Sequence, residues 1–233
     1  MAQSLPLVLV PGLLCSARLY QAQIAPLWQF GQVAVADHRR DDDMAGVAAR
    51  ILSLAPPRFA LAGLSMGGYI AFAMMRLAPE RIVKLALLDT SARPDMPESK
   101  AGREKFIAMA EAGKLSEVVD ALTPRFLHRS RQNDEGVKQT VRDMAVETGA
   151  EAFVRQTKAI MSRQDSRPLL SQIGCPTLVL VGEGDELTPP ELAKEIASGI
   201  SGAKLVVVPG CGHLSTLEQP EAVNAALVGW LSD

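Results

Sequence analysis

One serine stands in a glycine-rich turn between an apolar run and a helical pattern. Ser65 is the centre of Gly-Leu-Ser-Met-Gly at residues 63–67, after the apolar residues 59–62 and before the helical spacing of residues 69–77. Small residues on both sides let the chain double back, so the strained corner exposes the serine hydroxyl. Backbone N–H groups at the start of the next helix favour negative charge there. We interpret Ser65 as a nucleophile for acyl transfer; the alternative is an inert serine in a strand-to-helix joint.

A nucleophilic serine needs a base within hydrogen-bond reach, and the chain contains three histidines. His213 lies in a glycine-containing loop after the predicted strand at residues 204–208, and loops at the carboxyl ends of parallel strands present functional side chains. The sequence therefore predicts His213 as the base. We interpret His38, within the charged residues 37–43, as part of a solvated loop rather than a metal ligand. His128 has no supporting pattern.

The acid that orients the histidine is expected between the serine and the histidine, after another strand. Residues 177–181 form a near-continuous apolar run of the kind found in buried parallel strands, and Asp185 follows in a glycine-containing turn. We choose Asp185, because its short side chain after Gly184 suits a fixed hydrogen bond to the imidazole. Asp89, at the end of the predicted strand at residues 84–88, is the alternative, since an acid one strand earlier could also reach the histidine.

Acyl transfer also needs two N–H donors for the oxygen that gains negative charge. The backbone N–H of Met66 comes with the serine turn. The N–H of Leu13 is expected from the loop after the first apolar run, where Gly12 permits a tight bend. Because these donors belong to the backbone, side chains of the same segments are free to bind substrate. The predicted substrate-binding side chains are those of Leu13, Leu14 and Met66.

Together these motifs resemble those of the α/β-hydrolase superfamily, in particular its compact bacterial esterase-like and peroxidase-like members. The similarity rests on Pro-Gly-Leu at residues 11–13, the serine motif at 63–68, Gly-Glu-Gly-Asp at 182–185 and Gly-His at 212–213. It covers nearly the whole chain in the family's order. The resemblance implies an α/β fold with a doubly wound, mostly parallel sheet, and a small helical cap inserted after the sixth of the family's usual eight strands.

Two segments depart from the family's pattern. Pro11 stands where most relatives have a histidine before the glycine of the oxyanion loop, which keeps the backbone donor but removes a side chain. Relatives also often carry Arg-Gly-His-Gly after the strand that corresponds to residues 33–36, and residues 37–43 read Asp-His-Arg-Arg-Asp-Asp-Asp instead. We therefore expect one wall of the pocket to differ from that of familiar members.

The elements that position these residues alternate in the manner of strand–helix–strand crossovers. The predicted strands are residues 5–10, 33–36, 59–62, 84–88, 177–181 and 205–208. Helices are predicted at residues 18–28, 44–54, 190–198 and about 218–231. Between residues 90 and 174 only helical periodicity remains. We therefore expect one domain over residues 1–233, with a helical cap inserted at about 91–168.

Composition places the chain among globular proteins that have neither nucleic acid nor membrane as a partner. Its 233 residues are 48% hydrophobic and 21% charged, which suits one sizeable core. A net charge of −2 argues against nucleic acid and anionic lipid. Cys15, Cys175 and Cys211 lack metal-ligand spacing, so we expect reduced thiols in a cytosolic protein. The apolar N-terminal run lacks the features of a signal peptide, and no transmembrane helix is expected.

The sequence predicts a cytoplasmic serine hydrolase that acts on a small ester-like substrate through Ser65, His213 and Asp185. The reaction passes through an acyl-enzyme and needs no cofactor or metal.

Two alternatives stay open, because a fold does not choose the reaction. The same triad supports C–C bond hydrolysis, lyase chemistry or perhydrolysis, and a carboxylate of such a substrate could bind Arg125, Arg129 and Arg131, although surface arginines are more often solvated. The other alternative is a small-ligand sensor that retains the triad.

Overall fold

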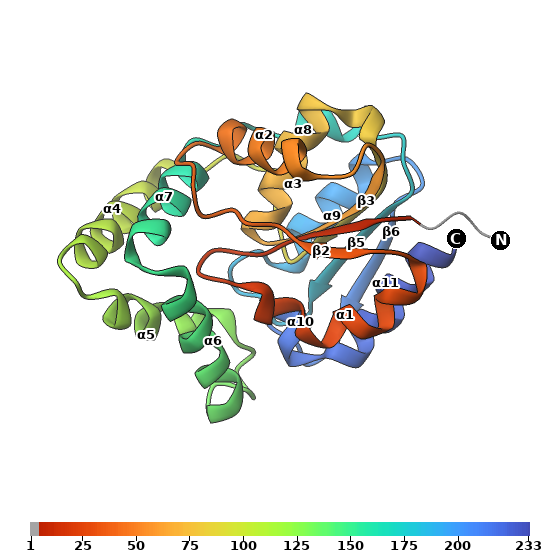
Figure 1. Cartoon of the computed structure of the whole chain (residues 1–233). Helices are drawn as coiled ribbons and strands as arrows, with labels where there is room; N and C mark the ends of the chain where they lie inside the picture. Colours follow the sequence, from red (N-terminus) through yellow and green to blue (C-terminus); the bar gives the residue numbers. More distant parts are fainter. Residues whose placement is uncertain (1–4) are drawn as a thin grey trace.

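The computed structural model describes residues 5–233, which form a sheet of six parallel strands with helices on both faces (Figure 1). The strand order is β2-β1-β3-β4-β5-β6. The strands are β1 (Leu7–Val10), β2 (Val33–Val35), β3 (Phe59–Leu64), β4 (Ile82–Leu88), β5 (Thr177–Gly182) and β6 (Lys204–Val208). The predicted α/β class with a doubly wound parallel sheet is confirmed. The first four residues of the predicted domain lie outside the described residues.

Two apolar cores lie on opposite faces of the sheet. The helices that cover it are α1 (Gln21–Leu27), α2 (Met44–Leu54), α3 (Met66–Leu77), α9 (Pro190–Gly199) and α11 (Pro220–Ser232). In β1, Leu7 and Leu9 face the core under α1 and α11, whereas Val8 and Val10 face the core under α2, α3 and α9. Successive side chains of a strand point to opposite faces, so a strand buried on both faces is apolar throughout.

Of the helices between β4 and β5, four form a separate group beside the sheet. They are α4 (Pro97–Glu111), α5 (Leu115–Phe126), α6 (Glu135–Thr148) and α7 (Ala150–Met161). The short helix α8 (Arg167–Leu170) packs against α9 instead. Figure 1 shows α4, α5, α6 and α7 together at one side of the molecule, and we call these four helices the cap. No helix within residues 5–233 is both long and apolar enough to cross a lipid bilayer.

Two predicted helices are divided in the structure. The expected helix at residues 18–28 begins as a 3-10 turn, Ala17–Tyr20, before α1. The expected last helix consists of α10 (Ser215–Glu218) and α11, which starts at Pro220. Proline has no N–H to continue a helix but suits a first helical position, so it separates the two.

The parallel sheet gathers the candidate residues at one edge. Gly12 follows β1, Ser65 follows β3 and Asp89 follows β4. Asp185 and His213 lie in the loops after β5 and β6. Since all strands run in the same direction, their carboxyl ends meet at the same edge, where open α/β sheets bind ligands.

Candidate active site

Ser65 occupies the sharp corner between β3 and α3. Its φ of 57° and ψ of −113° are a combination that residues with a side chain rarely adopt, and such strain costs about 1–3 kcal/mol. A methyl group at Gly63 would lie 2.2 Å from the carbonyl oxygen of Gly67. A methyl group at Gly67 would lie 2.0 Å from the carbonyl oxygen of Val10. Both distances are far inside van der Waals contact, so glycine is what lets α3 start this close to the strands.

Ser65, His213 and Asp185 form a continuous chain of hydrogen bonds. His213 Nε2 lies 2.7 Å from Ser65 Oγ, and His213 Nδ1 lies 2.8 Å from Asp185 Oδ2. Asp185 Oδ1 accepts from the backbone N–H groups of Leu187 at 2.8 Å and Thr188 at 2.9 Å. The Thr188 hydroxyl donates to Asp185 Oδ2 at 2.7 Å. These donors fix the carboxylate, which in turn can hold the imidazole with Nε2 open to the serine proton.

The charges of this chain set its protonation. Burial disfavours the imidazolium, but the Asp185 charge and hydrogen bond outweigh burial and raise the pKa of His213 above its ordinary value. Burial also opposes ionisation of Asp185, but the charge and hydrogen bond of His213, with the bonds from Thr188, hold the pKa of Asp185 below its ordinary value. An ionised Asp185 therefore faces a histidine that is a stronger base than free imidazole.

Asp89, the alternative acid, is engaged by other groups. Its side chain is 0% exposed, and its Oδ1 accepts from the Gly182 N–H at 2.9 Å. Its Oδ2 accepts a hydrogen bond from the Ser215 hydroxyl. Burial, followed by the nearby Asp185 charge, raises the pKa of Asp89 to about 8. The geometry thus favours Asp185 as the partner of His213, and Asp89 ties β5 to the histidine loop.

The histidine loop also depends on residues that sequence reasoning did not single out. The His213 N–H donates to the Phe126 carbonyl at 3.0 Å, and the Phe126 ring is stacked with the imidazole at 6.2 Å between centroids. The buried Glu218 carboxylate accepts from the N–H groups of Gly212 at 3.0 Å and His128 at 2.8 Å. Phe126 ends α5, so the cap supports the base directly. No local pattern marks Glu218 as buried, because its contacts come from distant segments.

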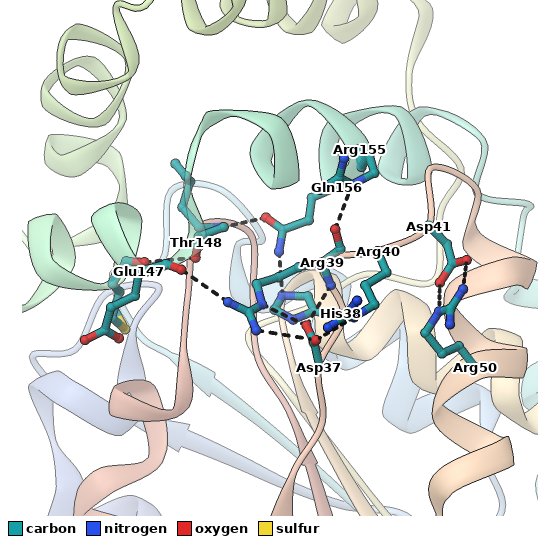
Figure 2. Close-up of polar contacts among 12 residues, drawn as sticks. Asp37, His38, Arg39, Arg40, Asp41, Arg50, Glu147, Thr148, Arg155 and Gln156 are labelled. Carbon is teal, nitrogen blue, oxygen red and sulfur yellow. Dashed lines mark hydrogen bonds and ion pairs between the residues drawn. The ribbon is translucent and has the colours of Figure 1, made fainter.

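The structure corrects the prediction that His38 lies in a solvated loop. Only 2% of His38 is exposed, and its Nε2 lies 2.9 Å from the Gly12 carbonyl oxygen. The charged neighbours are paired near the surface, where Asp37 binds Arg39 at 2.8 Å and Arg40 at 3.2 Å (Figure 2). Burial is the main cause that lowers the pKa of His38 to about 4, so its imidazole is neutral at neutral pH. The run of charged residues predicted exposure, but only the neighbours of His38 lie near the surface, whereas His38 itself is buried.

The predicted oxyanion segments both lie against Ser65. A methyl group at Gly12 would lie 3.4 Å from Ser65 Cβ, so the loop after β1 packs on the serine corner. Met66 is the first residue of α3, a position whose N–H has no partner within the helix. The Leu13 side chain lines the cavity described below. Contrary to the expectation from the sequence, the side chains of Leu14 and Met66 are buried in the two apolar cores.

A cavity of about 590 Å³ opens over Ser65 and His213, which is within the usual range for small-molecule sites. Its apolar lining includes Leu13, Phe106, Leu122, Phe126, Phe153, Ile160 and Leu187. Of the three arginines considered for carboxylate binding, Arg125 lines this cavity. Arg129 is exposed, and Arg131 makes an ion pair with Asp134 at 2.8 Å.

A compact ion-pair cluster forms the polar wall of the cavity. The buried Asp95 carboxylate lies 3.0 Å from Arg103 and 2.7 Å from Arg163. The Arg163 guanidinium also lies over the Tyr69 ring, 4.4 Å from its centroid. Tyr69 is one helical turn after Ser65, so this wall faces the reacting end of the cavity.

The cysteines near the site are buried thiols. Burial raises the pKa of Cys15 to about 12, and it raises the pKa of Cys211 above its ordinary value as well. Both thiols therefore remain protonated and unreactive at neutral pH. Within residues 5–233, no group of three or more histidine, cysteine, aspartate or glutamate residues is placed to hold a metal ion.

Comparison with known proteins places this chain in a family. A sequence model of the alpha/beta hydrolase family matches residues 7–226. The structure of a thermophilic esterase from Thermogutta terrifontis is 32% identical with a TM-score of 0.88, over 98% of this chain and 89% of that one. The enol-lactonase from Burkholderia xenovorans LB400 is 26% identical with a TM-score of 0.90, over 100% of this chain and 93% of that one.

A curated relative is also named as an esterase. The pimeloyl-[acyl-carrier protein] methyl ester esterase of Nitrosospira multiformis is 28% identical over 188 residues, which cover 77% of this chain and 70% of that protein. The family match spans nearly all of the present sequence, and these three relatives are named as esterases or as a lactonase, which are hydrolases. This chain therefore belongs to the alpha/beta hydrolase family and is a hydrolase.

Proposed function

We propose that this hydrolase cleaves small carboxylic esters through an acyl-enzyme on Ser65. The observation that supports the proposal most is the unbroken hydrogen-bond chain from Ser65 through His213 to Asp185, placed at the wall of a cavity. A serine hydroxyl is a weak nucleophile until a base accepts its proton, and this chain supplies that base. The esterase and lactonase names of the relatives agree with acyl transfer to water.

The proposed reaction has two halves. First, Ser65 Oγ attacks the ester carbonyl while His213 Nε2 takes the hydroxyl proton, and the Leu13 and Met66 amides donate to the resulting oxyanion. The tetrahedral intermediate collapses by breaking the ester C–O bond, and His213 protonates the departing alcohol. Then His213 takes a proton from water, whose oxygen attacks the acyl carbon. Ser65 leaves as the hydroxyl with the proton returned by His213.

The cavity favours a small ester whose acyl or alcohol part is apolar. Its volume of about 590 Å³ and its apolar lining suit such a group. Asp95 contacts both Arg103 and Arg163, so it balances one of these two positive charges, and Arg125 also lines the cavity. From the apolar lining we expect esters of short or medium chain length to be substrates, and the remaining positive charge is compatible with a carboxylate on the substrate.

A chain-length series tests the proposal. Wild-type protein, Ser65→Ala and the control Ser53→Ala are compared on p-nitrophenyl esters from acetate to octanoate, together with labelling by a fluorophosphonate. Ser53 is an exposed residue of α2 that donates to the Arg50 carbonyl, so its replacement should leave turnover unchanged. We expect Ser65→Ala to lose about 10⁴-fold or more of kcat and all labelling.

Other results would assign other functions. If Ser65→Ala retained most of the ester turnover, Ser65 would not be the nucleophile. If Ser65 reacted with fluorophosphonate but only C–C cleavage or perhydrolysis substrates were turned over, the triad would stand and the reaction would change. A protein that neither labels nor turns over any of these substrates would favour the ligand-sensor alternative.

A further inference from the structure

Two buried polar side chains hold the loop that carries the Leu13 amide. His38 comes from the loop after β2, and Gln156 comes from α7 of the cap (Figure 2). His38 Nε2 lies 2.9 Å from the Gly12 carbonyl oxygen. Gln156 Oε1 accepts from the Leu14 N–H at 3.1 Å. The two side chains also touch, with 3.0 Å between Gln156 Nε2 and His38 Nε2. We call His38 and Gln156 the loop clamp.

Because of peptide geometry, the contact between His38 and the Gly12 carbonyl also orients the Leu13 amide. The Gly12 carbonyl and the Leu13 N–H belong to one planar trans peptide unit, so they point in opposite directions. A hydrogen bond that fixes the carbonyl therefore also fixes the direction of the N–H. The same carbonyl accepts from the Cys15 N–H at 3.2 Å, which closes a four-residue turn. His38 thus holds the back of the peptide unit whose other side carries the proposed oxyanion donor.

Gln156 restrains the next peptide unit of the turn. Leu14 is the third residue of this turn and has a φ of 60°, a conformation that usually belongs to glycine. Such strain persists only where the surroundings enforce it. The bond from the Leu14 N–H to Gln156, which is 0% exposed, supplies that restraint. Pro11, on the other side of the loop, has neither an N–H nor a polar side chain to contribute.

Each possible position of the proton on His38 satisfies one of its two contacts. Gln156 presents Oε1 to the Leu14 N–H, so its NH₂ group faces His38. One ring nitrogen cannot donate to the Gly12 carbonyl and accept from Gln156 at the same time. With the hydrogen on Nε2, His38 donates to the Gly12 carbonyl, and the Gln156 NH₂ group lies against Nε2 without a hydrogen bond between them. With the hydrogen on Nδ1, Nε2 accepts from Gln156 and the carbonyl loses this donor.

We propose that His38, as its Nε2–H tautomer, and Gln156 are positioning residues that align the Leu13 amide with Ser65 while α7 is docked. This inference rests on the proposed function, because it assigns the clamp to the oxyanion hole of that reaction. An oxyanion hole is effective when its donors are fixed before the reaction begins. Since α7 carries half of the clamp, the alignment of the hole depends on the cap.

Four single variants separate alignment from general stability. His38→Ala and Gln156→Leu each remove one half of the clamp. His38→Gln keeps a side-chain N–H at a reach similar to that of Nε2. Arg155→Ala is the matched control, because Arg155 precedes Gln156 on α7 and its Nε donates to the Arg39 carbonyl at 2.8 Å (Figure 2). That variant weakens another link between cap and core without touching the turn.

The variants are measured for kcat, KM and inhibition by a trifluoromethyl ketone, which forms a tetrahedral adduct with a nucleophilic serine. For His38→Ala and Gln156→Leu we expect kcat to fall about 10- to 100-fold with KM within about 3-fold of wild type. Affinity for the ketone should fall in parallel with kcat/KM, since both report the tetrahedral state. His38→Gln should recover most of the loss, and Arg155→Ala should match wild type.

Two results would overturn the clamp. One is an unchanged kcat and ketone affinity in folded His38→Ala and Gln156→Leu proteins. The other is an equal loss in Arg155→Ala, which would assign the effect to cap docking alone. Hydrogen exchange of the Leu14 amide gives a readout that is independent of turnover, and it should become faster in both clamp variants. If Ser65→Ala remained active while this exchange responded, the proposed reaction would be wrong and the clamp would still hold the loop.

Discussion

Replacing Asp185 with asparagine should reverse the tautomer of His213 while keeping the shape of the site. The Leu187 and Thr188 N–H groups both donate to Asp185 Oδ1, at 2.8 Å and 2.9 Å. An asparagine must therefore keep its oxygen at these donors, because its NH₂ group cannot accept from them. The NH₂ group then faces His213 Nδ1 and forces that nitrogen to be an acceptor. The remaining hydrogen moves to Nε2, which points at Ser65 and can no longer take its proton.

In Asp185→Asn the general base is lost but the cavity is unchanged, so kcat should fall while KM stays similar. An aspartate-to-asparagine change that fixes the wrong tautomer in a Ser-His-Asp triad lowers kcat by about 10⁴-fold, or about 5 kcal/mol. We expect a loss of that order for Asp185→Asn, with KM within about 3-fold of wild type because the side chains that line the cavity are unchanged. The assay is initial-rate kinetics on the best p-nitrophenyl ester, with thermal unfolding as a check of the fold.

Asp89→Asn is the matched control, since it makes the same change at the alternative acid. Its oxygen can keep the Gly182 N–H, and its NH₂ group can donate to the Ser215 hydroxyl, which rotates to accept. We expect kcat within about 5-fold of wild type, because no proton of the reaction passes through this group. Comparable losses in the two variants, or a loss below about tenfold in Asp185→Asn, would refute the assignment of Asp185.

Two pH dependences follow from the same geometry. The Asp185 charge holds the pKa of His213 above its ordinary value despite burial. The value of kcat/KM should therefore rise with pH through a midpoint above about 6.5, and Asp185→Asn should lower this midpoint. His38 has a folded pKa of about 4, so between this value and the unfolded value of about 6.5 the unfolded chain binds more protons and stability falls as pH falls. Titration of His38 should therefore lower the free energy of unfolding by about 2 kcal/mol between about pH 7 and pH 5, measured by denaturant titration. This contribution should be absent in His38→Gln. If that variant lost as much stability at low pH as wild type, the buried, neutral state of His38 would be contradicted.

The strands and the serine corner could be predicted because their signals are local. A buried parallel strand is apolar over its whole length, and the corner at Ser65 needs glycine at two fixed positions. A methyl group at Gly63 or Gly67 would overlap with backbone atoms, which is the physical reason why glycine is required at these two positions. The histidine and acid loops followed from the same logic, since each stands directly after an apolar run.

The positions of His38, Leu14 and Glu218 could not be predicted because their contacts come from distant segments. A run of charged residues marks exposure on average, but His38 is buried among charged neighbours. Leu14 has a positive φ and its side chain is buried in the core. The sequence gives no sign of this, because leucine rarely adopts a positive φ. Glu218 is buried because the N–H groups of Gly212 and His128 converge on it.

These distant contacts make the cap part of the proposed machinery as well as a cover for the cavity. The last residue of α5, Phe126, accepts from the His213 N–H, and Gln156 of α7 accepts from the Leu14 N–H. The base loop and the oxyanion loop are therefore both anchored to the cap, although the strands that carry them lie in the sheet. A substitution that shifts α5 should disturb proton transfer, whereas one that shifts α7 should disturb stabilisation of the oxyanion. Changes in cap sequence would then alter turnover as well as substrate fit, because the Phe126 carbonyl and the Gln156 side chain move with the helices that line the pocket.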